Sequence, residues 1–78
     1  VLHPGGAKVL AAYEASLAVP RARLAAAWEV LRDHGNMSSA TLLFVLERFL
    51  RGTPASGAAG LAAALGPGFA AEGVVFRW

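Results

Sequence analysis

Apolar residues recur every three or four positions in two early stretches of the chain. This spacing predicts amphipathic helices over residues 7–18 and 21–34, with Pro20 well suited to open the second one. The residues that carry the spacing are Val9, Tyr13 and Leu17 in the first stretch and Leu24, Trp28 and Leu31 in the second. The charged residues of both stretches fall on other faces, as a solvated helix surface requires.

Residues 39–51 predict a third helix of a different kind. Its apolar residues wrap most of the circumference, and only Glu47, Arg48 and Arg51 mark an end that reaches water. A helix that is apolar nearly all round is normally buried on all sides. We therefore expect this third helix at the centre of the fold.

Short apolar runs at both ends of the chain predict strands. Pro4 favours an extended backbone at the preceding residue, His3. We therefore expect residues 1–2 to be the end of a strand that leads to His3. Val74 to Phe76 predict a strand over residues 73–78. The alanine-rich residues 61–65 also suit a helix, but we interpret them as a strand. The element order β-α-α-α-β-β indicates a layered α/β architecture.

The composition indicates a part of something larger. Of the 78 residues, 56% are hydrophobic and 15% are charged, against about 25% charged in an ordinary domain. So short and apolar a chain cannot hide all of this surface in itself, and we expect faces that pack on missing chain. Cysteine is absent, so the chain holds no disulfide, no thiolate metal ligand and no cysteine nucleophile.

Charge and hydropathy argue against nucleic acid and membrane as partners. The net charge is +2, but the seven cationic residues are scattered among acidic ones, which is unlike a nucleic-acid-binding stripe. The wholly apolar runs are far shorter than the ~20 residues that span a membrane. The N-terminus shows no export signal, which favours a cytoplasmic protein.

The polar junction Gly35-Asn36-Met37-Ser38-Ser39 separates the second and third helices and is the first candidate site. Gly35 permits a left-handed backbone, and Ser38 or Ser39 can cap the following helix. A side chain held in this way, together with His3, would give two donors aimed at one point, as oxyanion stabilisation requires. Taken singly, His3 and Asn36 are ordinary turn residues. His34 fits a solvated helix end, and two histidines without a carboxylate pair give no credible metal site.

The order and spacing of three motifs favour a catalytic role for His3 and Asn36 over that of ordinary turn residues. They are His3-Pro4-Gly5-Gly6, then Trp28 to Arg32 running into Gly35 to Thr41, then Leu65 to Phe69 before the terminal strand. Together they resemble the C-terminal part of the chalcone synthase-like, type III polyketide synthases, over essentially the whole chain. The resemblance implies that residues 1–78 are the C-terminal fragment of a thiolase-like, layered α/β/α domain whose parent protein is a homodimer.

The resemblance also implies a Cys-His-Asn site with His3 and Asn36 as catalytic residues. The cysteine would come from an earlier, missing part of the chain. Its thiolate would take an acyl group from acyl-CoA, and malonyl-CoA would be decarboxylated and condensed with it. CoA thioesters are then the substrates, no cofactor or metal is needed, and the fragment alone is expected to be inactive.

Further positions match parts of the family that bind substrate. Gly5 and Gly6 lie where the CoA arm passes, Ser38 matches a cavity-lining position, and Gly66-Pro67-Gly68 matches the loop that shapes the elongation pocket. Ala64-Leu65 departs from the usual Gly-Phe of plant members, so the pocket wall can differ. Two alternatives stay open, namely a ketoacyl synthase III-like enzyme and a non-catalytic, truncated binding module.

Overall fold

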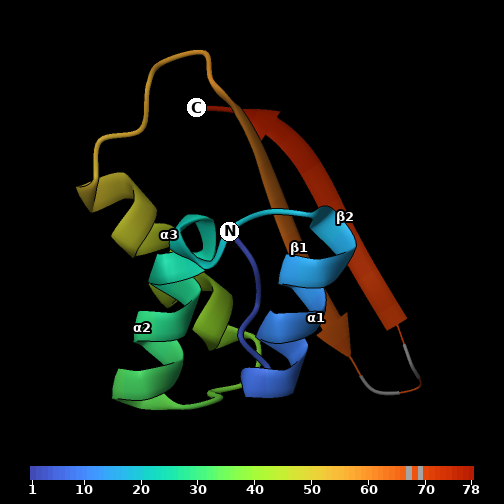
Figure 1. Ribbon diagram of the computed structural model, residues 1–78. Coiled ribbons are helices and arrows are strands. Elements are labelled where there is room, and N and C mark those ends of the chain that lie inside the picture. Colours follow the sequence, from blue (N-terminus) through green and yellow to red (C-terminus); the bar gives the residue numbers. More distant parts are fainter. Residues whose placement is uncertain (67, 69) are drawn as a thin grey trace.

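The helices of the chain form one layer and the strands form a hairpin beside it (Figure 1). The computed structural model describes residues 1–66, 68 and 70–78. The elements are α1 (Ala7–Leu17), the 3₁₀ helix η1 (Arg21–Leu24), α2 (Ala25–His34), α3 (Ala40–Arg51), β1 (Ala59–Gly66) and β2 (Ala70–Arg77). The predicted order of the three helices and the last two strands is confirmed, with two differences. The second predicted helix begins as the separate turn η1, and the predicted N-terminal strand is not a full strand.

The two strands pair antiparallel along their whole length. The register runs from Ala59 opposite Arg77 to Gly66 opposite Ala70. The alanine-rich stretch is thus a strand, because cross-strand pairing outweighs its helix propensity. The predicted first strand is reduced to one parallel bridge between Leu2 and Ala63. Its hydrogen bonds place the N-terminal segment beside β1, with the His3 N–H donating to the Ala63 carbonyl at 2.9 Å.

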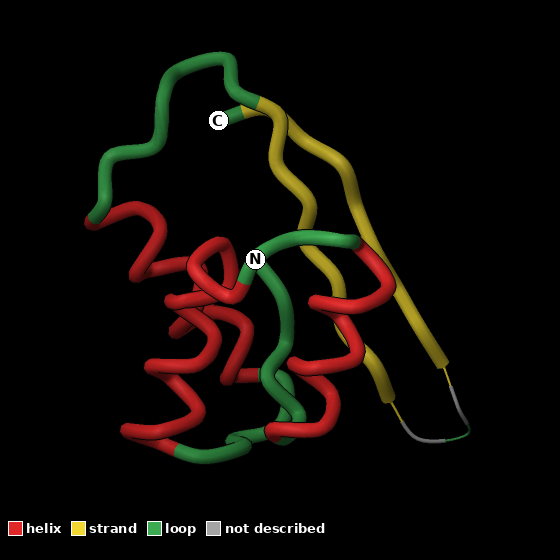
Figure 2. The backbone as a smooth tube through the Cα atoms, in the orientation of Figure 1, coloured by secondary structure: helices red, strands yellow, loops and turns green. Residues whose placement is uncertain are grey.

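The core lies among the three α-helices, whose backbones are drawn in red in Figure 2. Its fully or almost fully buried members are Leu10, Ala27, Val30 and Val45, contributed by α1, α2 and α3. Burying a leucine or valine side chain stabilises the fold by about 1.5–3 kcal/mol. This small cluster fixes α1 and α3 against α2, and thereby the loops that precede α1 and α3.

The third helix is not buried on all sides, and the prediction that it lies at the centre is wrong for this chain. Only Thr41 and Val45 of α3 are buried, whereas Leu43 is 65% and Leu50 is 58% exposed. Within the described residues, neighbours cover one side of α3 only. Val75 on β2 is likewise 75% exposed. The chain therefore presents apolar faces on both its helical layer and its hairpin.

Ion pairs join α2 to α3 on the surface. The Arg48 guanidinium donates to Glu29 at 2.9 Å and to Asp33 at 3.0 Å. Hydrogen bonding from Arg32, together with Arg48, lowers the pKa of the Asp33 carboxyl. Solvent screens such exposed pairs, which contribute little stability. The core residues, rather than these ion pairs, therefore supply most of the stability of the α2–α3 contact.

Candidate functional site

His3 is placed by the bridge to β1 and by the turn that follows it. Only 8% of its surface is exposed. Its ring nitrogen Nε2 lies 2.8 Å from the main-chain carbonyl oxygen of Ser38. Because a carbonyl oxygen can only accept a hydrogen bond, Nε2 must carry the proton in this contact. The structure thus presents His3 as a donor at Nε2.

Asn36 is held by the loop between α2 and α3. Gly35 ends α2 with φ +71°, a backbone conformation that favours glycine, as the sequence predicted. The Asn36 Oδ1 atom accepts the Ser38 N–H at 2.9 Å. Its Nδ2 atom donates to the Gly5 carbonyl at 3.4 Å, which is a long hydrogen bond. The amide nitrogen carries a second N–H that can serve another acceptor.

Two hydrogen bonds join the segment before α1 to the loop before α3, and each segment contributes one side chain and one main-chain carbonyl. His3 bonds to Ser38 across 35 positions of sequence, and Asn36 bonds back to Gly5 across 31 positions. Figure 1 shows the two segments at the same end of the helical layer, where α1 and α3 both begin. Helix N-termini carry partial positive charge and favour an anion nearby. The arrangement therefore combines two side-chain donors with a field suited to negative charge.

The start of α3 is capped differently from the prediction. Ser39 occupies the N-cap position, but its side chain makes no capping bond. Instead the Ser38 carbonyl accepts the Thr41 N–H at 3.1 Å, and the buried Thr41 Oγ1 accepts the Met37 N–H at 2.7 Å. Sequence reasoning missed Thr41. Its hydroxyl, in the first turn of a helix entered from a Gly-Asn turn, is the signal that could have found it.

The remaining predicted site residues divide between two places. Gly5 and Gly6 precede α1 and Ser38 precedes α3, so all three lie at the junction of the two segments. Gly66 and Gly68 lie at the tip of the β1–β2 hairpin, where an added β-carbon would meet open space. The structure does not join the hairpin tip to the hydrogen bonds around His3. Pro67 lies outside the described residues.

A large hollow of the described surface lies elsewhere. It measures about 750 Å³ and is open to solvent, between the ends of α1 and α3 and the start of β1. Its lining includes Leu2, Leu24, Phe49, Leu61 and Trp78 but neither His3 nor Asn36. It is mainly apolar, with Arg23 at its edge, and holds no nucleophile or acid–base pair. We therefore place the candidate site at the two loops rather than in this hollow.

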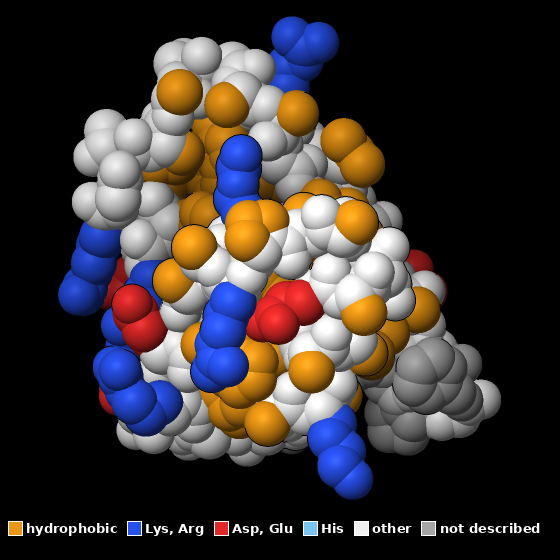
Figure 3. Space-filling view, viewed as in Figure 1, with side chains coloured by type: hydrophobic (Ala, Val, Ile, Leu, Met, Phe, Trp, Pro, Cys, Tyr) orange, Lys and Arg blue, Asp and Glu red, His pale blue; other side chains and the backbone are white. Residues whose placement is uncertain are grey.

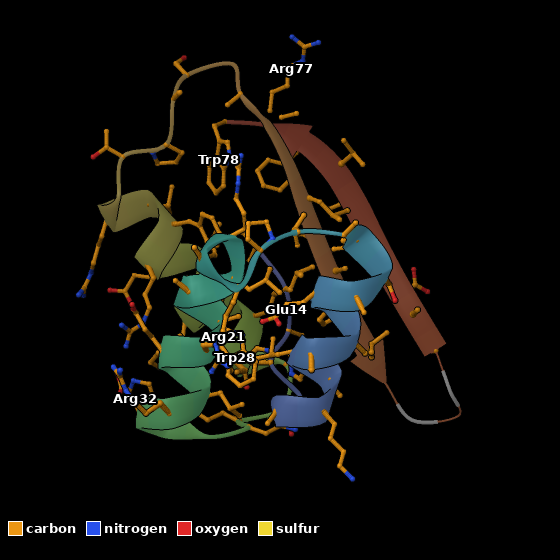
Figure 4. The ribbon with its side chains drawn as sticks, viewed as in Figure 1. Glu14, Arg21, Trp28, Arg32, Arg77 and Trp78 are labelled. Carbon is orange, nitrogen blue, oxygen red and sulfur yellow. The ribbon has the colours of Figure 1, made fainter. Side chains whose placement is uncertain are left out.

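A second polar cluster surrounds Trp28 (Figure 4). The Trp28 indole N–H donates to Glu14 at 2.7 Å, and the Arg21 guanidinium lies 3.8 Å from the centre of the ring. Trp28 also packs against the core, as the sequence predicted. The cluster joins α1, η1 and α2, so its geometry indicates a structural role.

Replacing Trp28 by phenylalanine tests that role. Trp28→Phe keeps an aromatic face for Arg21 but leaves Glu14 without its donor, and we expect the full-length protein to lose about 1–2 kcal/mol of unfolding free energy. Denaturant unfolding measures the loss. Arg32→Ala is the control, since the Arg32 side chain is 71% exposed and its removal should cost at most about 0.5 kcal/mol. Equal stability of Trp28→Phe and wild type would refute the role.

Surface charge is dispersed over the molecule. Figure 3 shows Lys and Arg side chains set singly over one face, with hydrophobic patches between them. Among residues 1–66, 68 and 70–78, no helix is long and apolar enough to cross a membrane. In the same part of the chain, no three His, Asp or Glu side chains gather as a metal site would need.

Comparison with known proteins gives consistent matches over the whole chain. Residues 1–78 match the sequence model of the family described as chalcone and stilbene synthases, C-terminal domain. The "Putative chalcone synthase" of Bacillus subtilis (strain 168) is 47% identical over 77 residues, covering 97% of this chain and 21% of the relative. The 1,3,6,8-tetrahydroxynaphthalene synthase of Streptomyces peucetius subsp. caesius is 47% identical over 79 residues, covering 100% and 21%. "Alpha-pyrone synthesis polyketide synthase-like Pks18" of Mycobacterium tuberculosis is 39% identical over 77 residues, covering 96% and 20%. The chain therefore spans about a fifth of the length of these relatives.

Proposed function

Because the chain belongs to the chalcone and stilbene synthases, as their C-terminal domain, we propose that it is the C-terminal part of a type III polyketide synthase. Two of its relatives are named for 1,3,6,8-tetrahydroxynaphthalene synthesis and for alpha-pyrone synthesis by a polyketide synthase-like protein. These names support a polyketide-forming reaction. Since the chain covers about a fifth of those proteins, the proposal concerns a longer protein.

The observation that carries the proposal is the pair of hydrogen bonds from His3 to Ser38 and from Asn36 to Gly5, which join the two loops. It gives a buried ring nitrogen and a side-chain amide, both donors, at one end of the molecule. Two fixed donors beside helix N-termini suit an oxyanion that develops during acyl transfer. We assign His3 and Asn36 to that role, and Gly5, Gly6 and Ser38 to the wall that the CoA thioester approaches.

The proposed chemistry needs a thiolate that this chain does not hold. A cysteine in the preceding part of the protein would attack the carbonyl carbon of an acyl-CoA, forming a thioester and releasing the CoA thiolate, which then takes up a proton. Malonyl-CoA would lose carbon dioxide, and the electron pair of the broken carbon–carbon bond would form an enolate. The enolate carbon would attack the acyl carbon and expel the cysteine thiolate. His3 and Asn36 would stabilise the negative oxygen at each stage.

The exposed apolar faces support a larger protein. Leu43 and Leu50 on α3, and Val74 and Val75 on β2, are each more than half exposed. Exposed patches of this kind mark surfaces that pack on another part or partner. We propose that the preceding part of the chain covers them, and that the complete protein is a homodimer located in the cytoplasm.

The test is an extension assay on the full-length protein. Incubation with malonyl-CoA and a series of acyl-CoA starters, followed by mass analysis, is expected to give products longer than the starter. The isolated 78-residue chain, which lacks cysteine, serves as the background control. Extension from malonyl-acyl carrier protein alone would instead favour a ketoacyl synthase III-like enzyme. Absence of extension with both donors would leave a binding module and refute the proposal.

A further inference from the structure

Ser38 adopts a backbone conformation that serine seldom takes. Its φ is +59°, in the left-handed region, where the β-carbon of an L-residue crowds the following carbonyl oxygen. Such conformations persist only where the surroundings hold them in place, and they cluster at functional sites. The hydrogen bonds around Ser38 therefore indicate why its main chain is held in this conformation.

Two hydrogen bonds within the loop hold the main chain of Ser38, one at its N–H and one at its carbonyl. Its N–H donates to Asn36 Oδ1 at 2.9 Å, and its carbonyl accepts the Thr41 N–H at 3.1 Å. Thr41 is fully buried and also receives the Met37 N–H on its hydroxyl oxygen at 2.7 Å. The loop is thus anchored to the first turn of α3, and the direction of the Ser38 carbonyl is fixed.

That carbonyl is aimed at the His3 ring, with 2.8 Å between the oxygen and Nε2. Since the oxygen can only accept, the contact selects the form of the neutral ring that carries its proton on Nε2. We propose that Ser38 is a positioning residue, whose main-chain carbonyl holds His3 in the Nε2-protonated tautomer. The ring is then a hydrogen-bond donor before any acyl group arrives.

The proposal links the two candidate catalytic residues through one residue. Asn36 holds the N–H of Ser38, and the carbonyl of Ser38 holds His3. The effect on turnover rests on the function proposed above, because it requires that the single Nε2 N–H turns from the Ser38 carbonyl to the reacting oxygen when the acyl group is in place. The effect on the tautomer does not, since it follows from the hydrogen bonds alone.

An ester in the main chain tests the carbonyl without changing the side chains of His3, Asn36 or Ser38. In the full-length protein, lactic acid in place of Ser39 turns the Ser38–Ser39 amide into an ester, whose carbonyl is a weaker acceptor. Ser39→Ala is the matched control, because it carries the same side chain on an intact amide. Lactic acid in place of Ala40 is the positional control, since that ester weakens the carbonyl of Ser39 instead.

Nitrogen-15 spectra of labelled histidine report the tautomer of each ring, with His3→Gln used to assign the His3 signals. The ester after Ser38 is expected to lower the fraction of His3 protonated on Nε2, whereas both controls keep it. The kcat of extension is expected to fall about three- to ten-fold, the size of one neutral hydrogen bond, with KM unchanged. An unchanged tautomer in the ester protein would overturn the proposal.

Ser38→Gly supplies a second measurement if the ester protein does not fold. Glycine adopts positive φ freely, so the variant should keep the fraction of His3 that is protonated on Nε2. A redistribution of the tautomer in Ser38→Gly would show that the serine side chain, not the carbonyl, holds the ring. If the wild-type full-length protein makes no product while the ester after Ser38 shifts the His3 tautomer as expected, the polyketide proposal fails and the positioning stands.

Discussion

The full-length protein carrying His3→Ala is expected to lose about 10²- to 10⁴-fold in kcat for chain extension. The ring is almost wholly buried, and its Nε2 proton is directed by the Ser38 carbonyl. Alanine removes both the donor to the reacting oxygen and the group that would stabilise the partner thiolate. Because these interactions develop along the reaction, the loss should appear in kcat rather than in KM.

His34 provides the matched control for this variant. It is exposed at the end of α2, where its ring lies 5.0 Å from that of Phe44. His34→Ala removes the same side chain from a position outside the proposed site, and kcat should stay within about two-fold, as for an ordinary surface change. Circular dichroism on both variants separates misfolding from lost chemistry. A folded His3→Ala protein with wild-type kcat would contradict the assignment.

Local patterning predicted most of the elements but not the surroundings of α3. The spacing of apolar residues located the helices within a few residues because each helix buries one stripe against the small core. The apolar circumference of α3 indicates that something covers it, yet it cannot say what. In this chain α2 covers one side only, and Leu43 and Leu50 remain exposed. Residues 61–65 became a strand because β2 and the Leu2 bridge pair with them.

The candidate site was predictable in its side chains but not in its main chain. His3 and Asn36 stood out through the order of the motifs, and the structure brings their loops together. The left-handed Ser38 gave no such signal, since its positive φ depends on contacts that form only in the folded protein, including the one with His3 across 35 positions of sequence. For the same reason, the expected side-chain cap from Ser38 or Ser39 did not form. The carbonyl of Ser38 took that place.

Asn36→Ala in the full-length protein is expected to lower kcat about 10²- to 10³-fold, as the loss of one oxyanion donor does. Asn36 contributes twice, because Nδ2 supplies the proposed donor and Oδ1 holds the strained Ser38. The variant should therefore also disturb the His3 tautomer, which a lost donor alone would not do. Steady-state kinetics and the histidine spectra measure the two effects. Ser39 lies in the same loop, and its side chain makes no capping bond. Ser39→Ala should therefore change neither kcat nor the His3 tautomer.

The double variant His3→Ala with Asn36→Ala decides whether the two residues act as a unit. Independent contributions would multiply, so the double variant would lose the product of the two single losses. If Ser38 links them, removal of Asn36 already misplaces the ring, and the later loss of the ring costs less. We expect the double variant to lose little more than the worse single variant, as in other sites whose groups act together. Full multiplication of the two losses would show that Asn36 and His3 act separately, and that the hydrogen bonds through Ser38 do not couple them.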